Sequence, residues 1–409
     1  MKVKLSIIIV LLSLAFYTCK KESISTSQSS SFIKYFGTSS ASQGYDLKQT
    51  SDGGYIIVGT TLINGNNTDV FLVKTDANGN KQWSNHYDNA NANLPDIGKS
   101  IQIAADGYIV LGTTYTVKND SDLYLIKTNF SGNVMWSDTI GGSGSQVGNC
   151  VQIMNDGNFV VAGSTNPMGV QRNFFLAKVN KAGATQWRGT PSVSGSSSGL
   201  DNVIDYVQVV NDSTLYVMGK SKNQSGDYQV YVGVAYNNNA ILPLLTLQNP
   251  FVTGFSNMTG NNECLMGCSL SDKTKLVITG YQNSNLYLAN IAETESQEVS
   301  LPSAICSVTP FAISGMTGIV GNFVQTSTDG GYIIVGNYSN SSSDIDQYLL
   351  KVNSSGTKDW DLKVGGKGID LGNAVIQTSD GGYAFTGSTA LDNVTVMTLT
   401  KVSSQGKLQ

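Results

Sequence analysis

The chain has 409 residues, of which 40% are hydrophobic and 13% are charged. This composition supplies enough apolar material for a core and excludes a disordered, highly charged chain. The formal net charge of −4 excludes a nucleic-acid partner, because no excess of Lys and Arg is present to neutralise phosphates. The 44 glycines are typical of short strands joined by tight turns.

The first 31 residues predict an export signal followed by a tether. Lys2 and Lys4 precede an apolar run over 5–16, which has the length of a signal-peptide core and is too short for a membrane span of about 20 residues. Cys19 and a stretch rich in Ser, Thr and Gln follow. The arrangement resembles a bacterial lipoprotein signal, although Phe-Tyr-Thr before Cys19 is bulkier than usual. We expect a signal peptide over 1–18 and a tether over 19–31 with a lipid on Cys19; the alternative is plain secretion.

The rest of the chain contains an internal repeat. The phrase Gln-Thr-Ser-Asp-Gly-Gly-Tyr occurs at Gln49–Tyr55 and Gln377–Tyr383, and a copy with one extra residue occupies Gln325–Tyr332. Looser copies begin at Gln102, Gln152 and Gln208, with a degenerate one near Cys268. A glycine ends the apolar segment of every copy, at Gly59, Gly112, Gly163, Gly219, Gly280, Gly336 and Gly387. These columns predict seven units with a period of about 50 to 60 residues.

Each unit predicts four strands, which we call a to d. In the first unit they are expected near 46–50, 55–60, 69–75 and 81–87. The a–b connection at 51–54 and the c–d connection at 76–79 are short turns whose glycines permit positive φ. Four-stranded units of this period indicate propeller blades. We therefore expect an all-β fold, a seven-bladed β-propeller of four-stranded antiparallel blades, over residues 32–409.

The columns resemble the bacterial β-propeller repeats of secreted and surface proteins, known as SBBP-type repeats. That pattern places a Trp before Gly-Gly, then Asp-Gly, then a strand that ends in Gly. It is carried here by Trp136, Gly141-Gly142, Asp156-Gly157 and Gly163, and again by Trp360, Gly365-Gly366, Asp380-Gly381 and Gly387. The resemblance covers almost all of residues 32–409, with a poor match over 200–321. It implies the fold and export, but no defined activity.

The two ends of the repeat region complement each other. The last unit stops before its strand d, and Phe32–Gly37 aligns with strand d of the preceding unit at Trp360–Gly365. We therefore expect Phe32–Phe36 to pair with strand c of the last blade, near Val396–Val402. This pairing closes the ring and removes an exposed sheet edge.

The b–c and d–a connections predict the functional face. They are expected to be long and variable, as at 62–68, 115–121, 166–172, 221–228 and 339–346. They are rich in Asn, Ser, Asp and Gly, which suits hydrogen bonding to a polar ligand such as a glycan. The alternative is that they are only solvated loops. The candidate binding residues are Asn64, Asn66, Tyr115, Asn119, Asp120, Asn166, Arg172, Asn223, Tyr228, Tyr338 and Asp344. The glutamine that begins most copies is interpreted as a structural bridge between blades.

No catalytic residue, metal site or cofactor is predicted. The single histidine, His86, has no Gly-x-Ser-x-Gly motif to accompany it. The acidic pairs could bind calcium or serve a glycosidase, but their places in loops and at strand ends favour simple solvation. These pairs are Asp120/Asp122, Asp344/Asp346 and Asp359/Asp361. Disulfides among Cys264, Cys268 and Cys306 stay open, and Cys150 is interpreted as a small buried residue.

The leading hypothesis is a non-catalytic binding or scaffold lipoprotein of the cell envelope. It is expected to be a monomer that faces the periplasm or the cell surface and touches the outer membrane only through its lipid. Its partner is a glycan or a protein, contacted through the b–c and d–a face. The alternatives are a propeller-type hydrolase or lyase with carboxylates at the channel mouth, and a structural adhesin.

Overall fold

The computed structural model describes residues 31–37, 40–65, 67–89, 94–118, 120–167, 171–190, 201–222, 228–236, 247–248, 269–270, 275–282, 285–292, 305–310, 318–341, 343–392 and 394–408. Within these ranges, 28 strands form seven four-stranded antiparallel sheets. In six sheets the strands follow chain order from the inside outward, whereas the seventh takes its outermost strand from the start of the chain.

The first sheet contains β2 (Ser42–Gln49), β3 (Tyr55–Asn64), β4 (Asn67–Thr75) and β5 (Lys81–Tyr87). The second and third contain β6 (Asp96–Ala104), β7 (Gly107–Tyr115), β8 (Ser121–Thr128) and β9 (Val134–Ile140), and β10 (Ser145–Ile153), β11 (Phe159–Asn166), β12 (Asn173–Val179) and β13 (Thr185–Gly189). The fourth and fifth contain β14 (Asn202–Asn211), β15 (Thr214–Lys222), β16 (Tyr228–Tyr236) and β17 (Leu247–Gln248), and β18 (Ser269–Leu270), β19 (Lys275–Gln282), β20 (Asn285–Ala292) and β21 (Ile305–Pro310). The sixth and seventh contain β22 (Ile319–Thr326), β23 (Tyr332–Ser341), β24 (Asp344–Val352) and β25 (Lys358–Val364), and β26 (Leu371–Gln377), β27 (Tyr383–Leu391), β28 (Val394–Val402) and β1 (Phe32–Phe36).

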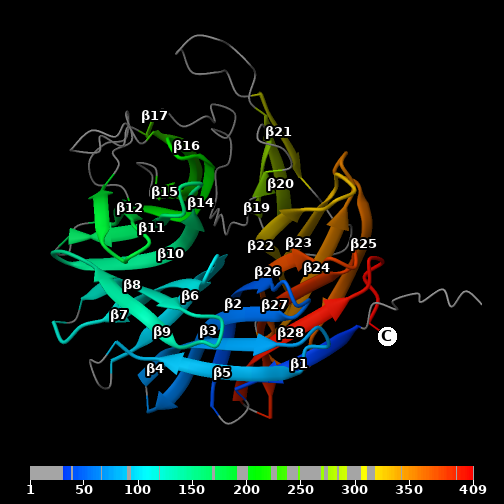
Figure 1. Ribbon diagram of the computed structural model, residues 1–409. Coiled ribbons are helices and arrows are strands. Elements are labelled where there is room, and N and C mark those ends of the chain that lie inside the picture. The colour runs from blue at the N-terminus through cyan, green and yellow to red at the C-terminus, as the bar shows by residue number, and fades with distance from the viewer. Residues whose placement is uncertain are drawn as a thin grey trace, which may run out of the picture.

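Neighbouring sheets pack face to face through apolar side chains. Among the described residues, six buried clusters join consecutive sheets, from the fifth through the sixth, seventh, first, second and third to the fourth. Between the first and second sheets, for example, Val58 and Leu72 pack in one cluster with Ile101 and Val110, and all four are fully buried. This arrangement, seen in Figure 1, confirms the all-β propeller fold. The contact of the fourth sheet with the fifth, which would complete the ring, stays a prediction.

The N-terminal strand β1 is the outer edge of the seventh sheet. It pairs antiparallel with β28, with Phe32 opposite Lys401 and Phe36 opposite Met397, and Figure 1 shows the two strands side by side. Phe32 also packs edge-on against Tyr55 of the first sheet, with ring centroids 6.2 Å apart. The predicted pairing of the first strand with the last blade is thus present.

The repeated glycine follows from a bulge in the inner strand. In each of the six inner strands that the structure describes at this point, one residue is skipped in the pairing, as between Gly98 and Ser100. The glycine of the next strand lies opposite, and a Cβ on Gly112 would collide with the carbonyl oxygen of Ile97. Only glycine allows the two backbones to approach this closely.

An ion pair between a buried lysine and a partly exposed aspartate links strand c to the a–b turn of each regular sheet. The lysine side chains are 3 to 10% exposed, and each contacts the turn aspartate at 2.7–3.0 Å. The pairs are Lys74–Asp52, Lys127–Asp106, Lys178–Asp156, Lys351–Asp329 and Lys401–Asp380. This contact explains why the Asp-Gly turn and the strand-c lysine recur together in the sequence.

The b–c connections are shorter than the sequence predicted. In the first sheet the ladder of β3 and β4 continues through Leu62 opposite Thr68 to Asn64 opposite Asn67, so strand replaces most of the expected loop. In the sixth sheet β23 likewise extends to Ser341 and β24 begins at Asp344. The expectation of long loops here was wrong, because polar side chains on an edge of the blade are compatible with continued backbone pairing.

Candidate binding site in the central channel

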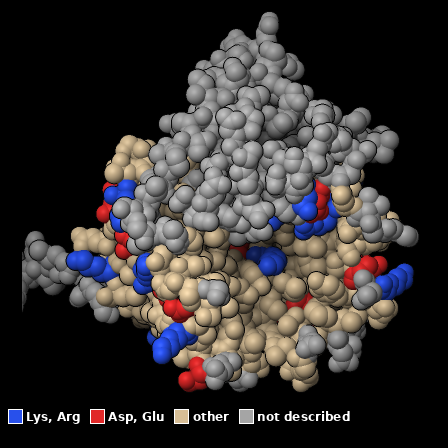
Figure 2. Space-filling model, turned by 180° about the vertical axis from the view of Figure 1, so that it is seen from behind, with Lys and Arg blue, Asp and Glu red and all other residues tan. Residues whose placement is uncertain are grey.

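A cavity of about 330 Å³ lies on the axis around which the sheets are arranged. Its described lining comes entirely from the inner strands β2, β6, β10, β14, β22 and β26, which contribute three stacked rings of side chains. On the face drawn in Figure 2, charged side chains are scattered over the rim, and Lys or Arg atoms also lie in the hollow near its centre. The volume is at the lower end of the range of small-molecule sites.

The first ring consists of the six bulged residues. Three are asparagines that carry the same contact, in which Nδ2 donates to a carbonyl oxygen of the next inner strand at 2.7–2.8 Å. These are Asn149 to Ile204, Asn322 to Gly372 and Asn373 to Gly44. The bulge aims these amides at the channel wall, and there they bridge neighbouring sheets. The asparagine at this position is therefore structural.

The other three residues of this ring break the pattern. Tyr45, Lys99 and Asp205 occupy the bulges of the first, second and fourth sheets. The Lys99 Nζ atom lies 3.5 Å from the centroid of the Tyr45 ring, a cation–π contact. Each departure replaces the asparagine amide with an ionisable or aromatic group that lines the cavity.

Lys99 is an ionisable group of the channel lining whose pKa is perturbed. The residue is half-buried and lines the cavity. Burial lowers the pKa of Lys99 to about 8, and the charge of Asp205 opposes this effect. A perturbed ionisable group that faces a cavity is a frequent mark of a functional site.

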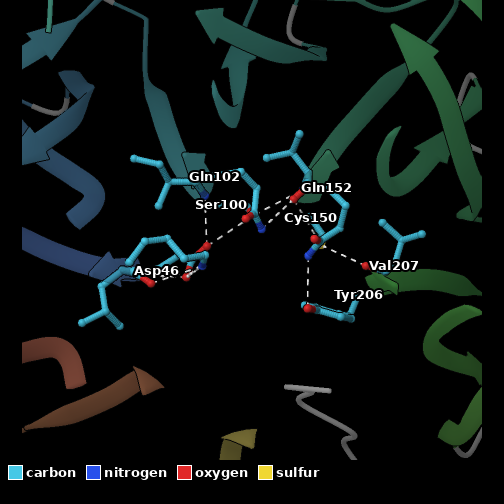
Figure 3. Close-up of polar contacts among 11 residues, drawn as sticks. Asp46, Ser100, Gln102, Cys150, Gln152, Tyr206 and Val207 are labelled. Carbon is cyan, nitrogen blue, oxygen red and sulfur yellow. Dashed lines mark hydrogen bonds and ion pairs between the residues drawn. The ribbon is translucent and has the colours of Figure 1, made fainter. Parts of the chain in front are cut away.

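The second ring forms a polar chain along one wall of the channel, drawn in Figure 3. Asp46 Oδ2 accepts the backbone N–H of Ile101 at 3.0 Å, and Ser100 Oγ accepts that of Val151 at 3.2 Å. Asp46 Oδ1 also contacts Lys48 Nζ at 2.6 Å. The half-buried Asp46 carboxylate is therefore occupied by contacts with the protein itself, and its first role is to join the first and second sheets.

The third ring shows that the repeated glutamines do not all occupy the same position in their strands. Gln102, Gln152, Gln208 and Gln325 share one position, opposite the residue three places before the repeated glycine. Gln49 and Gln377 lie one residue further along, so Lys48 and Ile376 face the channel in their place. This difference in position was not visible in the repeated sequence, because the inner strands differ in length before the a–b turn.

The glutamines nevertheless bridge neighbouring sheets, as expected. Gln152 Nε2 donates to the Tyr206 hydroxyl at 3.1 Å, and Gln102 Nε2 donates to the carbonyl of Val151 at 3.2 Å. Gln49 Oε1, in the offset register, accepts the N–H of Ser379 at 2.8 Å. Gln208 is an exception, because its Nε2 donates to the carbonyl of Val209 in its own strand at 3.2 Å. The structural interpretation is therefore confirmed for the other five described glutamines.

Four of the seven described candidates on the b–c and d–a face make contacts with neighbouring side chains or backbone. Arg172 forms a two-armed ion pair with Asp201, and Lys363 Nζ lies 3.3 Å from the ring centroid of Tyr338. Asp344 accepts the N–H of Gly368 at 3.2 Å, and Asp120 accepts the hydroxyl of Thr116. Tyr115 and Asn64 are exposed at strand ends, whereas Asn166 is half-buried. These candidates come from several different sheets, and their binding role stays a prediction.

The remaining candidates lie outside the described residues. They are Asn66, Asn119 and Asn223, together with the side chain of Tyr228. The same holds for the signal peptide, for Cys19 and for the tether as far as residue 30. Cys264 and Cys268 and the side chain of Cys306 are also outside this set. Cys150 is buried, and burial raises the pKa of its thiol to about 11, so the interpretation as a small core residue is confirmed.

The acidic pairs proposed from the sequence are mostly occupied by neighbours. Asp361 contacts Lys358 at 2.8 Å and accepts the Tyr348 hydroxyl at 3.0 Å. Asp359 lies 3.5 Å from Lys351, and Asp346 accepts the Asn340 amide at 2.7 Å. A different acidic group, Asp69, Asp88 and Asp96, gathers near His86 between the first and second sheets, and sequence spacing gave no sign of it.

Sequence reasoning also missed the channel ring. Its signal was present in the residue that follows the first glycine of each inner strand, where Asn recurs at 149, 322 and 373. Tyr45 and Lys99 stand at the same place after Gly44 and Gly98.

No helix in the described part of the chain is long and apolar enough to cross a membrane.

The fold and its central cavity place the chain among β-propeller proteins. A periplasmic gluconolactonase of Pseudomonas aeruginosa is similar over 89% of this chain and 99% of its own, with a TM-score of 0.51 and 12% identity. The WD40 domain of SCAP from fission yeast has a TM-score of 0.40 at 10% identity, over 92% and 99% of the two chains. The C-terminal domain of Pseudomonas aeruginosa PilY1 has a TM-score of 0.47 at 9% identity, over 85% and 92%. Such likeness shows the fold alone.

At the level of sequence, the chain matches no family model and no curated protein. The resemblance to SBBP-type repeats and to lipoprotein signals therefore stays a prediction.

Proposed function

We propose that this chain is a non-catalytic binding lipoprotein of the bacterial cell envelope that holds an acidic sugar in its central channel. The observation that carries the proposal is the break in symmetry at Tyr45, Lys99 and Asp205. A position kept as asparagine in the other described sheets serves packing, whereas an aromatic or ionisable side chain replaces the asparagine amide at these three positions. Ligand binding is a reason to depart from a structural residue at a position that lines a cavity.

The chemistry of the lining supports a sugar that carries a carboxylate. The Lys99 ammonium can pair with an anionic group. The Asp205 carboxylate and the amides of Gln102 and Gln208 can bind hydroxyl groups of a sugar ring. Tyr45, Tyr206 and Phe323 add aromatic surface to the same cavity. A polar ligand with an apolar ring face would use all of these groups.

The envelope location is supported by the predicted export signal and by the predicted lipid on Cys19. The b–c and d–a face would then supply secondary contacts to a longer glycan or to a protein. This arrangement agrees with the general tendency of repeat folds to bind ligands on one face and along their axis.

The test is calorimetric titration of residues 20–409 with D-gluconate, D-glucuronate and D-galacturonate, and with glucose and galactose as neutral probes, followed by an array of acidic glycans. We expect at least one acidic probe to bind and the Lys99→Met variant to lose about tenfold or more in affinity. Lys81→Met, which changes an exposed lysine at the start of β5 and outside the channel, is the matched control. Unchanged affinity in Lys99→Met, or binding of neutral and acidic probes alike, would refute the proposal.

A hydrolase or lyase is the second candidate, because a lysine with a pKa near 8 is partly neutral at physiological pH and can accept a proton. The gluconolactonase shares the fold but is only 12% identical. Incubation of the same protein with D-glucono-1,5-lactone and with acidic oligosaccharides separates the two functions. Turnover that Lys99→Met abolishes would favour the enzyme, and binding without turnover would favour the binding protein.

A further inference from the structure

Three carboxylates meet at the corner between the first and second sheets, away from the central channel. Asp69 lies in β4, Asp88 follows β5, and Asp96 begins β6. One oxygen from each lies within 4.8 Å of the others. Asp69 and Asp96 are 3% and 1% exposed, whereas Asp88 is open to solvent. Three negative charges this close repel one another unless a cation or a proton intervenes.

The two buried carboxylates each have an oxygen without a partner. Asp69 Oδ2 contacts His86 Nδ1 at 2.6 Å, and Asp96 Oδ2 accepts the N–H of Asn89 at 2.9 Å. The Oδ1 atoms of Asp69 and Asp96 are buried and make no hydrogen bond. A buried carboxylate oxygen without a hydrogen bond is costly, and two such oxygens at one corner call for a physical explanation.

In the equivalent corner of the third sheet, both polar atoms of the side chain at the position of Asp96 make hydrogen bonds within the protein, without a cation. Gln146 takes the place of Asp96, and its Oε1 accepts the N–H of Gly142 at 2.9 Å, as Asp96 accepts that of Asn89. Its Nε2 donates to Thr165 at 3.0 Å, so the second polar atom is also used. The seventh sheet is similar.

In the corresponding corner of the seventh sheet, Asp370 takes the place of Asp96. Its Oδ2 accepts the N–H of Gly366 at 2.8 Å, and its Oδ1 accepts the N–H of Ala390 at 2.9 Å and the hydroxyl of Thr389. Of these three side chains, only Asp96 has a second polar atom without a hydrogen-bond partner.

Asp88 also departs from the repeat. It stands where the other two corners have Gly141 and Gly365, five residues after the strand-d tryptophan. A Cβ on Gly141 would collide with the Asp122 carboxylate, and one on Gly365 would collide with that of Asp346. The first sheet therefore places a third carboxylate at the one point where the other corners admit no side chain at all.

We propose that Asp69, Asp88 and Asp96 bind a calcium ion. Calcium takes six to eight oxygen ligands, and three carboxylates can supply up to six of them, with water completing the shell on the open side of Asp88. The His86 ring nitrogen holds Asp69 in place through its second oxygen. An all-oxygen set of three carboxylates suits a hard cation and not zinc, which favours nitrogen and sulfur. The ion would fasten the end of the first blade to the start of the second.

The experiment measures binding of calcium to residues 20–409 after treatment with EDTA and removal of the chelator. Calorimetry and terbium luminescence report binding, and the melting temperature reports the effect on the fold. We expect saturable binding of one ion with a Kd at or below about 1 mM, as in extracellular modules, and a rise in melting temperature with CaCl₂. We expect Asp88→Asn to weaken binding at least tenfold.

Two variants serve as controls. Asp88 is exposed, so Asp88→Asn is compatible with folding, and circular dichroism verifies this. Asp122→Asn changes the aspartate that takes the place of Asp69 in the second sheet and is expected to leave binding unchanged. Absence of binding at 5 mM CaCl₂, about fivefold above the highest expected Kd, would overturn the proposal. So would equal affinity for Mg²⁺, or equal affinity of the Asp88→Asn variant.

Discussion

Removal of β1 tests whether the first strand completes the seventh sheet. Deletion of 32–36 strips β28 of its partner along five paired residues and removes Phe36, which is 7% exposed and packs in the core between the seventh and first sheets. Loss of a buried Phe costs about 3–5 kcal/mol, and each lost backbone hydrogen bond costs about 1 kcal/mol more. The expected loss of at least about 5 kcal/mol is comparable with the whole free energy of unfolding of a domain, about 5–15 kcal/mol.

The assay is thermal unfolding followed by circular dichroism, with size-exclusion chromatography beside it. We expect the melting temperature to fall by about 10 °C or more and the exposed edge of β28 to promote association. Deletion of 22–29, within the predicted tether, is the matched control and is expected to have no effect. If the protein without 32–36 melts within about 2 °C of the parent, β1 does not hold the ring together and the reasoning fails.

Two further predictions concern the repeated contacts. Gly112→Ala forces a Cβ onto the Ile97 carbonyl and is expected to cost about 3 kcal/mol, whereas Gly142→Ala meets nothing within 4 Å and is expected to be neutral in the same urea titration. Equal effects would contradict the close-approach explanation. For Asp52, burial tends to raise the pKa, but hydrogen bonds from Lys74, Thr50 and the Gly54 N–H, with the Lys74 charge, lower it to about 2. Because the folded-state pKa is depressed, the stabilisation of the parent over Asp52→Asn is expected to be present above pH 4 and to vanish as the pH falls towards 2. Since half of the Asp52 side chain is exposed, the difference is expected to be at most about 1 kcal/mol, and a difference that persists at pH 2 would contradict the assignment.

The sequence alone determined the features that every blade must share. Each blade solves the same packing problem, so the glycine opposite the bulge, the Asp-Gly turn and the strand-c lysine recur as visible columns. The place of Phe32 followed from the same columns, since it stands where the other blades have tryptophan. These contacts are local to one blade or repeat between neighbours, and comparison of the units is enough to find them.

The tertiary structure alone decided which residues share the channel and the acidic corner. Tyr45, Lys99 and Asp205 belong to different repeats, and only the arrangement of the sheets about an axis brings them around one cavity. The bulge sets which side chain points inward, and a difference of one residue in strand length moved Gln49 out of the channel position. Asp88 joins Asp69 and Asp96 only because the end of one blade meets the start of the next. Side-chain direction in a strand reverses with each residue, so register and packing, which a pattern of residues leaves open, decide what a site contains.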